Sequence, residues 1–268
     1  MVATKHVLIT GASSGLGEAF AQSFAEKGYN LTLNARREDK LKALRDRLIQ
    51  TNSSIDILLA PGDVSQKNTV ADIVAQSMAH FSKLDVVVAN AGQGMWSRFS
   101  DIKDPDELHD LMQLNYMGVV YSLFYTLPHL RQNKGSFVAI SSIQGVIPVV
   151  YHTGYVASKY AVNGLIETIR LEEPDVHFLL AMPSWISGTE LRSHALGGQG
   201  SHAIKVKTTH GKHATSTKDC AESIIHALLA GKDDVFIPNT YRLVPTLRNL
   251  FKSVFDKVVT NKVKGQLS

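Results

Sequence analysis

Short apolar runs alternate with segments of helical periodicity along almost the whole chain, and this alternation limits the possible folds more than any other feature. Several of the runs are apolar at consecutive positions, which is typical of strands buried on both faces of a parallel sheet. Apolar residues between the runs, such as Leu41, Leu44 and Leu48, recur at helical spacing. The pattern predicts an α/β fold, a doubly wound parallel sheet with helices on both faces. Its seven expected strands are 6–10, 30–35, 55–61, 84–91, 136–141, 176–183 and 234–238.

Length and composition fit one globular domain. The 268 residues are 44% hydrophobic and 19% charged, and we expect a single domain over 1–240 with an amphipathic extension over 241–268. The net charge of +4 comes without a basic-aromatic motif, so no nucleic-acid partner is expected. A single cysteine, Cys220, excludes an intrachain disulfide and a cysteine-based zinc site, and we interpret it as a buried helix residue. The sequence offers no membrane span or signal peptide, which favours a cytoplasmic protein.

Three glycines follow the first expected strand, in the stretch TGASSGLG at 10–17. Gly11 allows a tight turn, Gly15 lets the backbone approach a pyrophosphate, and Gly17 lets the next helix pack closely. Backbone N–H groups at the start of that helix then face the anion. A glycine turn without any ligand has the same pattern, so the loop alone does not establish a dinucleotide site.

The end of the second expected strand bears on the choice of cofactor. An acid at this position bonds the ribose 2′-hydroxyl of NAD, but here Arg36 and Arg37 follow Ala35. A guanidinium suits a 2′-phosphate, so we predict NADP, with NAD less favoured. The alternative is that both arginines only flank a helix start, where cations are somewhat unfavourable.

A tyrosine and a lysine are spaced for one helix face farther along. Tyr155 and Lys159 form an i,i+4 pair, and we expect the ammonium to lower the pKa of the phenol from its usual value of about 10. Ser141 and Ser142 end the preceding strand, at the sheet edge where open α/β sheets bind ligands. A hydroxyl there can bond a substrate carbonyl while Tyr155 delivers a proton. The Tyr–Lys pair alone is commonly structural.

Taken together, these motifs resemble the short-chain dehydrogenase/reductase family, over about residues 5–190. The matching features are Thr10–Gly17, Asp63 in GDV, Asn90–Gly92, Asn115 in LNYMG, Ser142 thirteen residues before Tyr155, and Tyr155-x-x-x-Lys159. The resemblance implies a Rossmann-like fold and a catalytic set of Asn115, Ser142, Tyr155 and Lys159.

The roles of these four residues are what the resemblance implies. Tyr155 is the general acid in reduction and the base in oxidation, and Ser142 steadies the substrate oxygen. Lys159 binds the nicotinamide ribose, and Asn115 holds a water that links Lys159 to a proton relay. Ser141 has the wrong spacing to Tyr155, so Ser142 is the candidate.

The resemblance also implies a set of cofactor contacts. Three departures from the family pattern concern Ala89, Ser184, which replaces a glycine after Pro183, and Gly188, which falls in a threonine slot. The implied contacts are Gly11, Ser13, Ser14, Gly15, Leu16 and Gly17 at the phosphates and ribose; Arg36 and Arg37 at the 2′-phosphate; Asp63 and Val64 at adenine; Asn90, Ala91 and Gly92 at the ribose side; and Ile186 and Thr189 at the nicotinamide carboxamide.

The segment 190–216 is rich in Gly, Ser, Thr and His without periodicity, and we interpret it as a substrate lid. Its His202, His210 and His213 lack helical spacing and nearby carboxylates, so no metal site is expected. Before it in the chain, Met95, Trp96 and Phe99 either line a substrate pocket or only cover the sheet.

The segment 241–265 combines apolar and basic residues. It packs over the substrate cleft or against a second subunit, or, as a basic amphipathic helix, it lies on a membrane surface. The apolar residues expected on one helix face are Leu247, Leu250, Phe251, Val254, Phe255 and Val258.

These features predict an NADP-dependent oxidoreductase that transfers a hydride between nicotinamide and a carbonyl or secondary alcohol. Apolar residues in 93–100, 144–153 and 190–216 indicate a hydrophobic small molecule, and steroid, retinoid, fatty-acyl and small aromatic carbonyls all stay open. NADP favours the direction of reduction. The resemblance implies a homodimer or homotetramer. Two other hypotheses are a cofactor-sensing binding protein without catalysis and a membrane-surface interaction protein.

Overall fold

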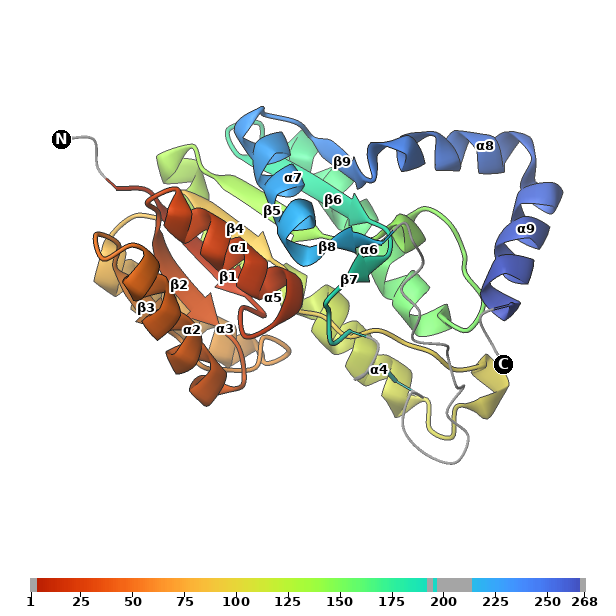
Figure 1. Cartoon of the computed structure of the whole chain (residues 1–268), viewed down its shortest axis with the longest axis horizontal. Coiled ribbons are helices and arrows are strands. Elements are labelled where there is room, and N and C mark those ends of the chain that lie inside the picture. The colour runs from red at the N-terminus through yellow and green to blue at the C-terminus, as the bar shows by residue number, and fades with distance from the viewer. Residues whose placement is uncertain (1–3, 192–194, 197–213, 266–268) are drawn as a thin grey trace.

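A seven-stranded parallel sheet forms the centre of the molecule. The computed structural model describes residues 4–191, 195–196 and 214–265 (Figure 1). The strand order is β3-β2-β1-β4-β5-β6-β9, and every neighbouring pair is parallel. The predicted doubly wound sheet is therefore confirmed. Its strands are β1 (His6–Thr10), β2 (Asn30–Asn34), β3 (Ile57–Leu59), β4 (Val86–Ala89), β5 (Ser136–Ile140), β6 (His177–Pro183) and β9 (Asp234–Ile237).

Helices cover both faces of this sheet (Figure 1). Helices α1, α2 and α7 pack on one face, and α3, α5 and α6 pack on the other. The helices are α1 (Gly15–Glu26), α2 (Glu38–Thr51), α3 (Lys67–Phe81), α4 (Asp106–Met112), α5 (Gly118–Asn133), α6 (Thr153–Glu172), α7 (Thr217–Leu229), α8 (Val244–Leu250) and α9 (Lys252–Lys264), with short turns η1 (Phe99–Asp101), η2 (Gln113–Met117), η3 (Ile143–Gly145) and η4 (Asn239–Leu243).

Strand β1 shows why the strand sequences are apolar at consecutive positions. Val7 and Ile9 belong to the core under α1, which includes Phe20, while Leu8 belongs to the core on the opposite face with Val87. Since successive side chains of a strand point to opposite faces, both sets must be apolar when both faces are covered. The sheet thus separates two cores, and its carboxyl edge is left to hold the site.

A second, smaller sheet was not predicted. Strands β7 (Ile186–Ser187) and β8 (Thr215–Ser216) pair in parallel, and two residues are too few to show a period. Of the predicted lid at 190–216, residues 192–194 and 197–213, including His202, His210 and His213, lie outside the described residues. The described part of this segment includes β8, and its Leu196 forms an isolated bridge with Met95.

Candidate active site

The glycine-rich loop joins β1 to α1 in a way that requires glycine. Gly11 and Gly15 have φ angles of +68° and +59°, in the left-handed region that favours glycine. A Cβ on Gly17 would clash with the carbonyl oxygen of Gly11. The loop therefore places the N-terminus of α1 close against the end of β1, an arrangement suited to binding an anion.

The ends of β1 and β4 are tied together beside this loop. The hydroxyl of Thr10 accepts the backbone N–H groups of Asn90 at 3.0 Å and Ala91 at 3.1 Å. The Asn90 side chain donates to the carbonyl of Thr10 at 3.0 Å. The motifs TGASSGLG and NAG, which are far apart in sequence, thus form one continuous wall.

This wall borders a cavity of about 1430 Å³. Single-ligand pockets usually hold about 300–1,000 Å³, so the cavity has room for a dinucleotide and a second molecule. The two predicted residues that do not line it are Gly17, behind the loop, and Asn115. The predicted residues that do are Gly11, Ser13, Ser14, Gly15, Leu16, Arg36, Arg37, Asp63, Val64, Asn90, Ala91, Gly92, Ser142, Tyr155, Lys159, Ile186 and Thr189.

Cations gather at the end of the cavity beside the loop. The Arg37 guanidinium donates to the hydroxyls of Ser13 at 3.2 Å and Ser14 at 3.1 Å, and to the carboxylate of Glu190 at 3.0 Å. That guanidinium and Lys40 hold the pKa of Glu190 below its usual value. Sequence reasoning missed Glu190, because only the folded chain brings it to the start of α2.

Arg36 is the more open of the two arginines. Its side chain is 73% exposed, and its guanidinium lies 3.9 Å from the carboxylate of Asp63. The predicted pair thus stands on both sides of the cavity mouth, with Arg37 toward the loop and Arg36 toward Asp63.

Ser142 and Tyr155 both line the cavity. Ser142 follows β5 and caps η3, and Tyr155 lies in the first turn of α6. The Ser142 hydroxyl donates to the carbonyl of Pro183 at 3.4 Å and is near enough to the Tyr155 phenol to favour its phenolate. The neighbouring Ser141 instead donates to Asn163 of α6, so the structure places Ser142, not Ser141, beside the tyrosine.

Lys159 is buried one turn along α6 from Tyr155. Its ammonium donates to the carbonyl of Ile140 at 2.8 Å and lies 5.6 Å from the centre of the Tyr155 ring. Burial lowers the pKa of Lys159 to about 8.

The expectation that Lys159 lowers the pKa of Tyr155 is wrong for this structure. Burial raises the pKa of Tyr155 to about 12, and the nearby Ser142 hydroxyl offsets this only in part. The physical reason is that desolvation penalises the phenolate, while the ammonium is bonded to a backbone carbonyl rather than to the phenol. Tyr155 is therefore protonated at neutral pH and ready to donate.

Asn115 lies behind Gly92, in a π-helical turn between α4 and α5. Its amide donates to the carbonyl of Gln93 at 2.9 Å and to the hydroxyl of Ser158 at 3.1 Å, and its oxygen accepts the N–H of Gln93 at 2.8 Å. Such turns are frequent at functional sites, and the sequence pattern did not predict this one. Asn115 thus fixes the segment after β4 against α6, and its role in holding a water stays a prediction.

The wall beyond Tyr155 is largely apolar and aromatic. Met95 and Trp96 line the cavity, whereas Phe99 is 66% exposed and lies outside it. Trp96 packs edge-on against His152, with 4.5 Å between ring centres. Met95 and Trp96 therefore take the first of the two expected roles, whereas Phe99 is exposed and takes neither.

Helix α9 closes the far end of this wall. Val259 and Val263 line the cavity, and Val263 packs with Trp96 and Trp185. The segment 241–265 therefore lies over the cleft, which is one of the arrangements expected from its sequence.

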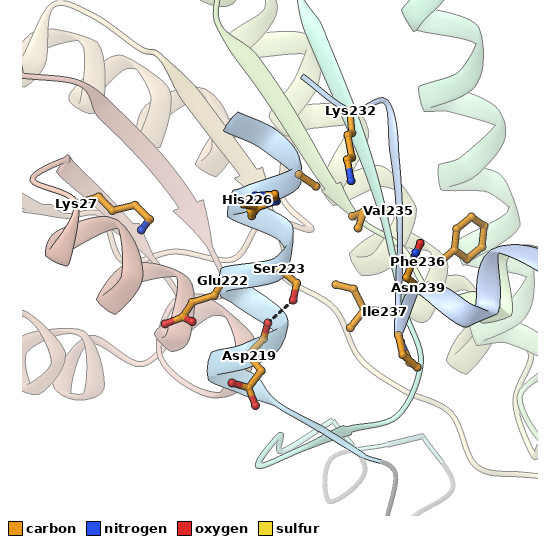
Figure 2. A pocket seen from close by; sticks show the side chains of 12 residues that line it. Lys27, Asp219, Glu222, Ser223, His226, Lys232, Val235, Phe236, Ile237 and Asn239 are labelled. Atoms are coloured by element: carbon orange, nitrogen blue, oxygen red, sulfur yellow. Dashed lines mark hydrogen bonds between the residues drawn. The ribbon is translucent and has the colours of Figure 1, made fainter. Parts of the chain in front are cut away.

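A second hollow, of about 650 Å³, lies between α7 and β9 (Figure 2). Asp219, Glu222 and His226 line it from α7, and Lys27 and Lys232 stand at its edges. None of the predicted site residues lines it. The sequence motifs therefore converge on the larger cavity and not on this one.

Comparison with known proteins agrees with this geometry. The sequence model of the short chain dehydrogenase family matches residues 5–196. The chain is 33% identical to the 11-beta-hydroxysteroid dehydrogenase-like 2 of Arabidopsis thaliana, over 95% of this chain and 80% of that protein.

Solved structures are similar as well. The alcohol dehydrogenase of the archaeon Thermococcus sibiricus, complexed with 5-hydroxy-NADP, has a TM-score of 0.77 and 28% identity, over 87% of this chain and 95% of that chain. A short-chain dehydrogenase from Streptomyces avermitilis has a TM-score of 0.78 and 26% identity, over 94% of each chain. The chain therefore belongs to the short-chain dehydrogenase/reductase family, oxidoreductases that act on alcohol and carbonyl groups with a nicotinamide cofactor.

Proposed function

We propose that this protein is an NADP-dependent enzyme that reduces the carbonyl group, or oxidises the secondary alcohol, of a bulky hydrophobic molecule. One observation carries the proposal: the hydroxyls of Ser142 and Tyr155 line the same cavity as the glycine-rich loop and both arginines. A protein that only senses a cofactor has no need of such a hydroxyl pair beside Lys159.

The proposed chemistry divides between cofactor and chain. Bound NADPH supplies the hydride in reduction. Tyr155 gives its phenolic proton to the carbonyl oxygen, and Ser142 donates a hydrogen bond to the same oxygen as negative charge develops there. Because Tyr155 is protonated at neutral pH, the site suits reduction, and oxidation requires that the phenol first lose its proton. Lys159, still cationic below its pKa of about 8, is assigned to the nicotinamide ribose.

NADP is proposed over NAD because of the cations at the cavity mouth. After β2 the chain has Arg36 and Arg37 at the position where an acid would bond the ribose 2′-hydroxyl of NAD, and Lys40 lies in the first turn of α2. The Thermococcus relative is described in complex with a modified NADP. Arg37 already bonds two serine hydroxyls of the loop, so it can orient toward a 2′-phosphate without a large movement.

The substrate class is proposed from the wall beyond Tyr155. Met95, Trp96 and Trp185 together with the valines of α9 suit an apolar molecule of considerable size. The Arabidopsis relative is named for hydroxysteroid dehydrogenases. Hydroxysteroids and their ketones therefore come first among the candidate substrates, ahead of retinoid, fatty-acyl and small aromatic carbonyls.

A homo-oligomer is also proposed. Phe124 on α5 and Leu171 on α6 are 67% and 84% exposed, and a second copy of the chain can cover such side chains. Light scattering of the purified protein measures the number of copies.

The test is a panel of ketones and alcohols, assayed by the absorbance of NADPH and of NADH. We expect turnover of a bulky ketone with NADPH, and its loss in Tyr155→Phe with NADPH binding retained. Tyr160→Phe is the matched control, because Tyr160 lies on the same helix and does not line the cavity. Unchanged turnover in Tyr155→Phe contradicts the proposal.

A further inference from the structure

The C-terminal helices carry a second apolar face, directed away from the cavity. While Val258, Val259 and Val263 line the cavity, Leu247, Leu250, Phe251 and Val254 do not line it and are between 46% and 69% exposed. Leu247 and Leu250 lie on α8, Val254 lies on α9, and Phe251 stands between the two helices; we call these four residues the stripe. Figure 1 shows α8 and α9 as the blue helices that extend beyond the sheet and its covering layers. A stripe of this kind on a projecting element is typical of an interaction surface.

The charges around the stripe are almost all positive. The segment 241–265 contains a single acid, Asp256, and this acid is bonded to Arg248 at 3.0 Å. The remaining cations have no other acid in the segment to neutralise them: Arg242, Lys252, Lys257, Lys262 and Lys264.

This charge pattern discriminates between the possible occupants. If a second copy covered the stripe around a two-fold axis, the same patch would face itself, which brings lysines against lysines. An anionic bilayer complements both features, since acyl chains accept the apolar side chains and headgroups pair with the lysines. Within the described parts of the chain, no helix is long and apolar enough to cross a bilayer, so the contact must be at the surface.

We propose that the outer face of α8 and α9 docks on the surface of an anionic lipid bilayer. Because α9 borders the cavity with its inner face, docking brings the substrate end of the cavity next to the lipid, where apolar molecules concentrate. The docking does not depend on the proposed function. Only the delivery of substrate from the lipid rests on it.

The test is co-sedimentation of the full chain with vesicles of phosphatidylcholine, alone or mixed with phosphatidylserine. We expect binding to the anionic vesicles that weakens in about 0.5 M salt. The variant Leu250→Ser/Phe251→Ser/Val254→Ser should lower the partition coefficient at least about tenfold. Its matched control, Ile49→Ser/Leu229→Ser, removes exposed apolar side chains from α2 and α7 and should bind as the unmodified protein does.

A second pair of variants tests the role of charge, and both members change the net charge of the protein by the same amount. Lys252→Glu/Lys257→Glu should abolish binding to anionic vesicles, whereas Lys67→Glu/Lys103→Glu, on exposed positions elsewhere, should retain most of it. Circular dichroism checks the fold of each variant. Turnover of a water-soluble ketone, measured in parallel, should be unchanged in all of them, so that a failure of docking is distinguishable from a failure of the proposed enzyme.

Two outcomes overturn the proposal. One is an unmodified protein that stays in the supernatant with anionic vesicles. The other is a serine variant that binds vesicles normally but changes its oligomeric state in light scattering, which would assign the stripe to a contact between copies of the chain.

Discussion

The two ends of the cavity are built by different means. At the cofactor end, backbone constraints leave little choice of residue: Gly11 and Gly15 are left-handed, Gly17 touches backbone, and Thr10 binds the start of the NAG segment. At the substrate end, the wall comes from side chains of 95–96, 185 and α9, which can change size without altering the backbone. We infer that the sheet determines the reaction and the C-terminal region determines which molecule undergoes it.

The largest effect on cofactor binding is expected where the backbone is tightest. Gly17→Ala puts a Cβ against the carbonyl of Gly11, so the loop must shift, and we expect NADPH affinity to fall at least about 100-fold, roughly 3 kcal/mol. Gly164→Ala is the control, because a Cβ there meets nothing within 4 Å. Alanine is the better helix former, so this variant should be about 0.5–1 kcal/mol more stable than the unmodified protein. Calorimetric titration measures the affinities. Equal affinity in both variants would remove the constraint we assign to the loop.

A lower pH should reduce the free energy of unfolding of the protein through protonation of His6 on β1. This buried side chain bonds the carbonyl of Lys83 and the hydroxyl of Thr32, and desolvation lowers its pKa from 6.5 to about 4. Between these two values His6 is protonated in the unfolded chain but neutral in the folded chain. The contribution of neutral His6 to the free energy of unfolding is therefore complete above pH 6.5 and is lost as the pH falls toward 4. The expected loss is about 3 kcal/mol.

Urea unfolding measured between pH 7 and pH 4 tests this loss, with His6→Asn as the comparison. The variant should be less stable at pH 7 and should show a smaller decline toward pH 4. A decline of the same size in both proteins would assign the acid sensitivity to other groups.

Cofactor choice is expected to change by a smaller amount. Arg36→Ala/Arg37→Ala removes both guanidinium groups, so kcat/KM with NADPH should fall about 10- to 100-fold while that with NADH changes little. Arg45→Ala, in an exposed pair with Asp46 on α2, should alter neither value. If the double variant kept its preference for NADPH, Lys40 or another group would have to bind the 2′-phosphate.

The smallest effect is expected at the substrate end. Val263→Ala removes a buried contact with Trp96, and KM for a bulky ketone should rise about three- to tenfold, with the dissociation constant of NADPH unchanged. Val254→Ala, on the exposed face of the same helix, should leave both constants as they are. A change in NADPH affinity on Val263→Ala would mean that the two ends of the cavity are coupled.

The same contrast explains what could be predicted from the sequence. All seven strands of the main sheet and the neighbourhood of Ser142 and Tyr155 follow from local patterns, because strand ends and glycine turns depend on nearby residues. The β7–β8 pair, the π turn at Asn115 and the Arg37–Glu190 bond depend on segments far apart in sequence. The sequence also predicted the wrong direction for the pKa shift of Tyr155. That shift depends on how deeply the phenol is buried, which the whole fold determines and the i,i+4 spacing to Lys159 does not reveal.

Transfer of deuterium from NADPH that carries deuterium at both hydrogen positions of C4 tests the proposed reaction most directly. The protein is incubated with the labelled cofactor and a bulky ketone from the panel, and the alcohol product is analysed by mass spectrometry. We predict one deuterium in the product with the unmodified protein and with Tyr160→Phe, and a rate lower by about three orders of magnitude with Tyr155→Phe. A product without deuterium, or the same rate in Tyr155→Phe, would contradict hydride transfer at this site with Tyr155 as its acid.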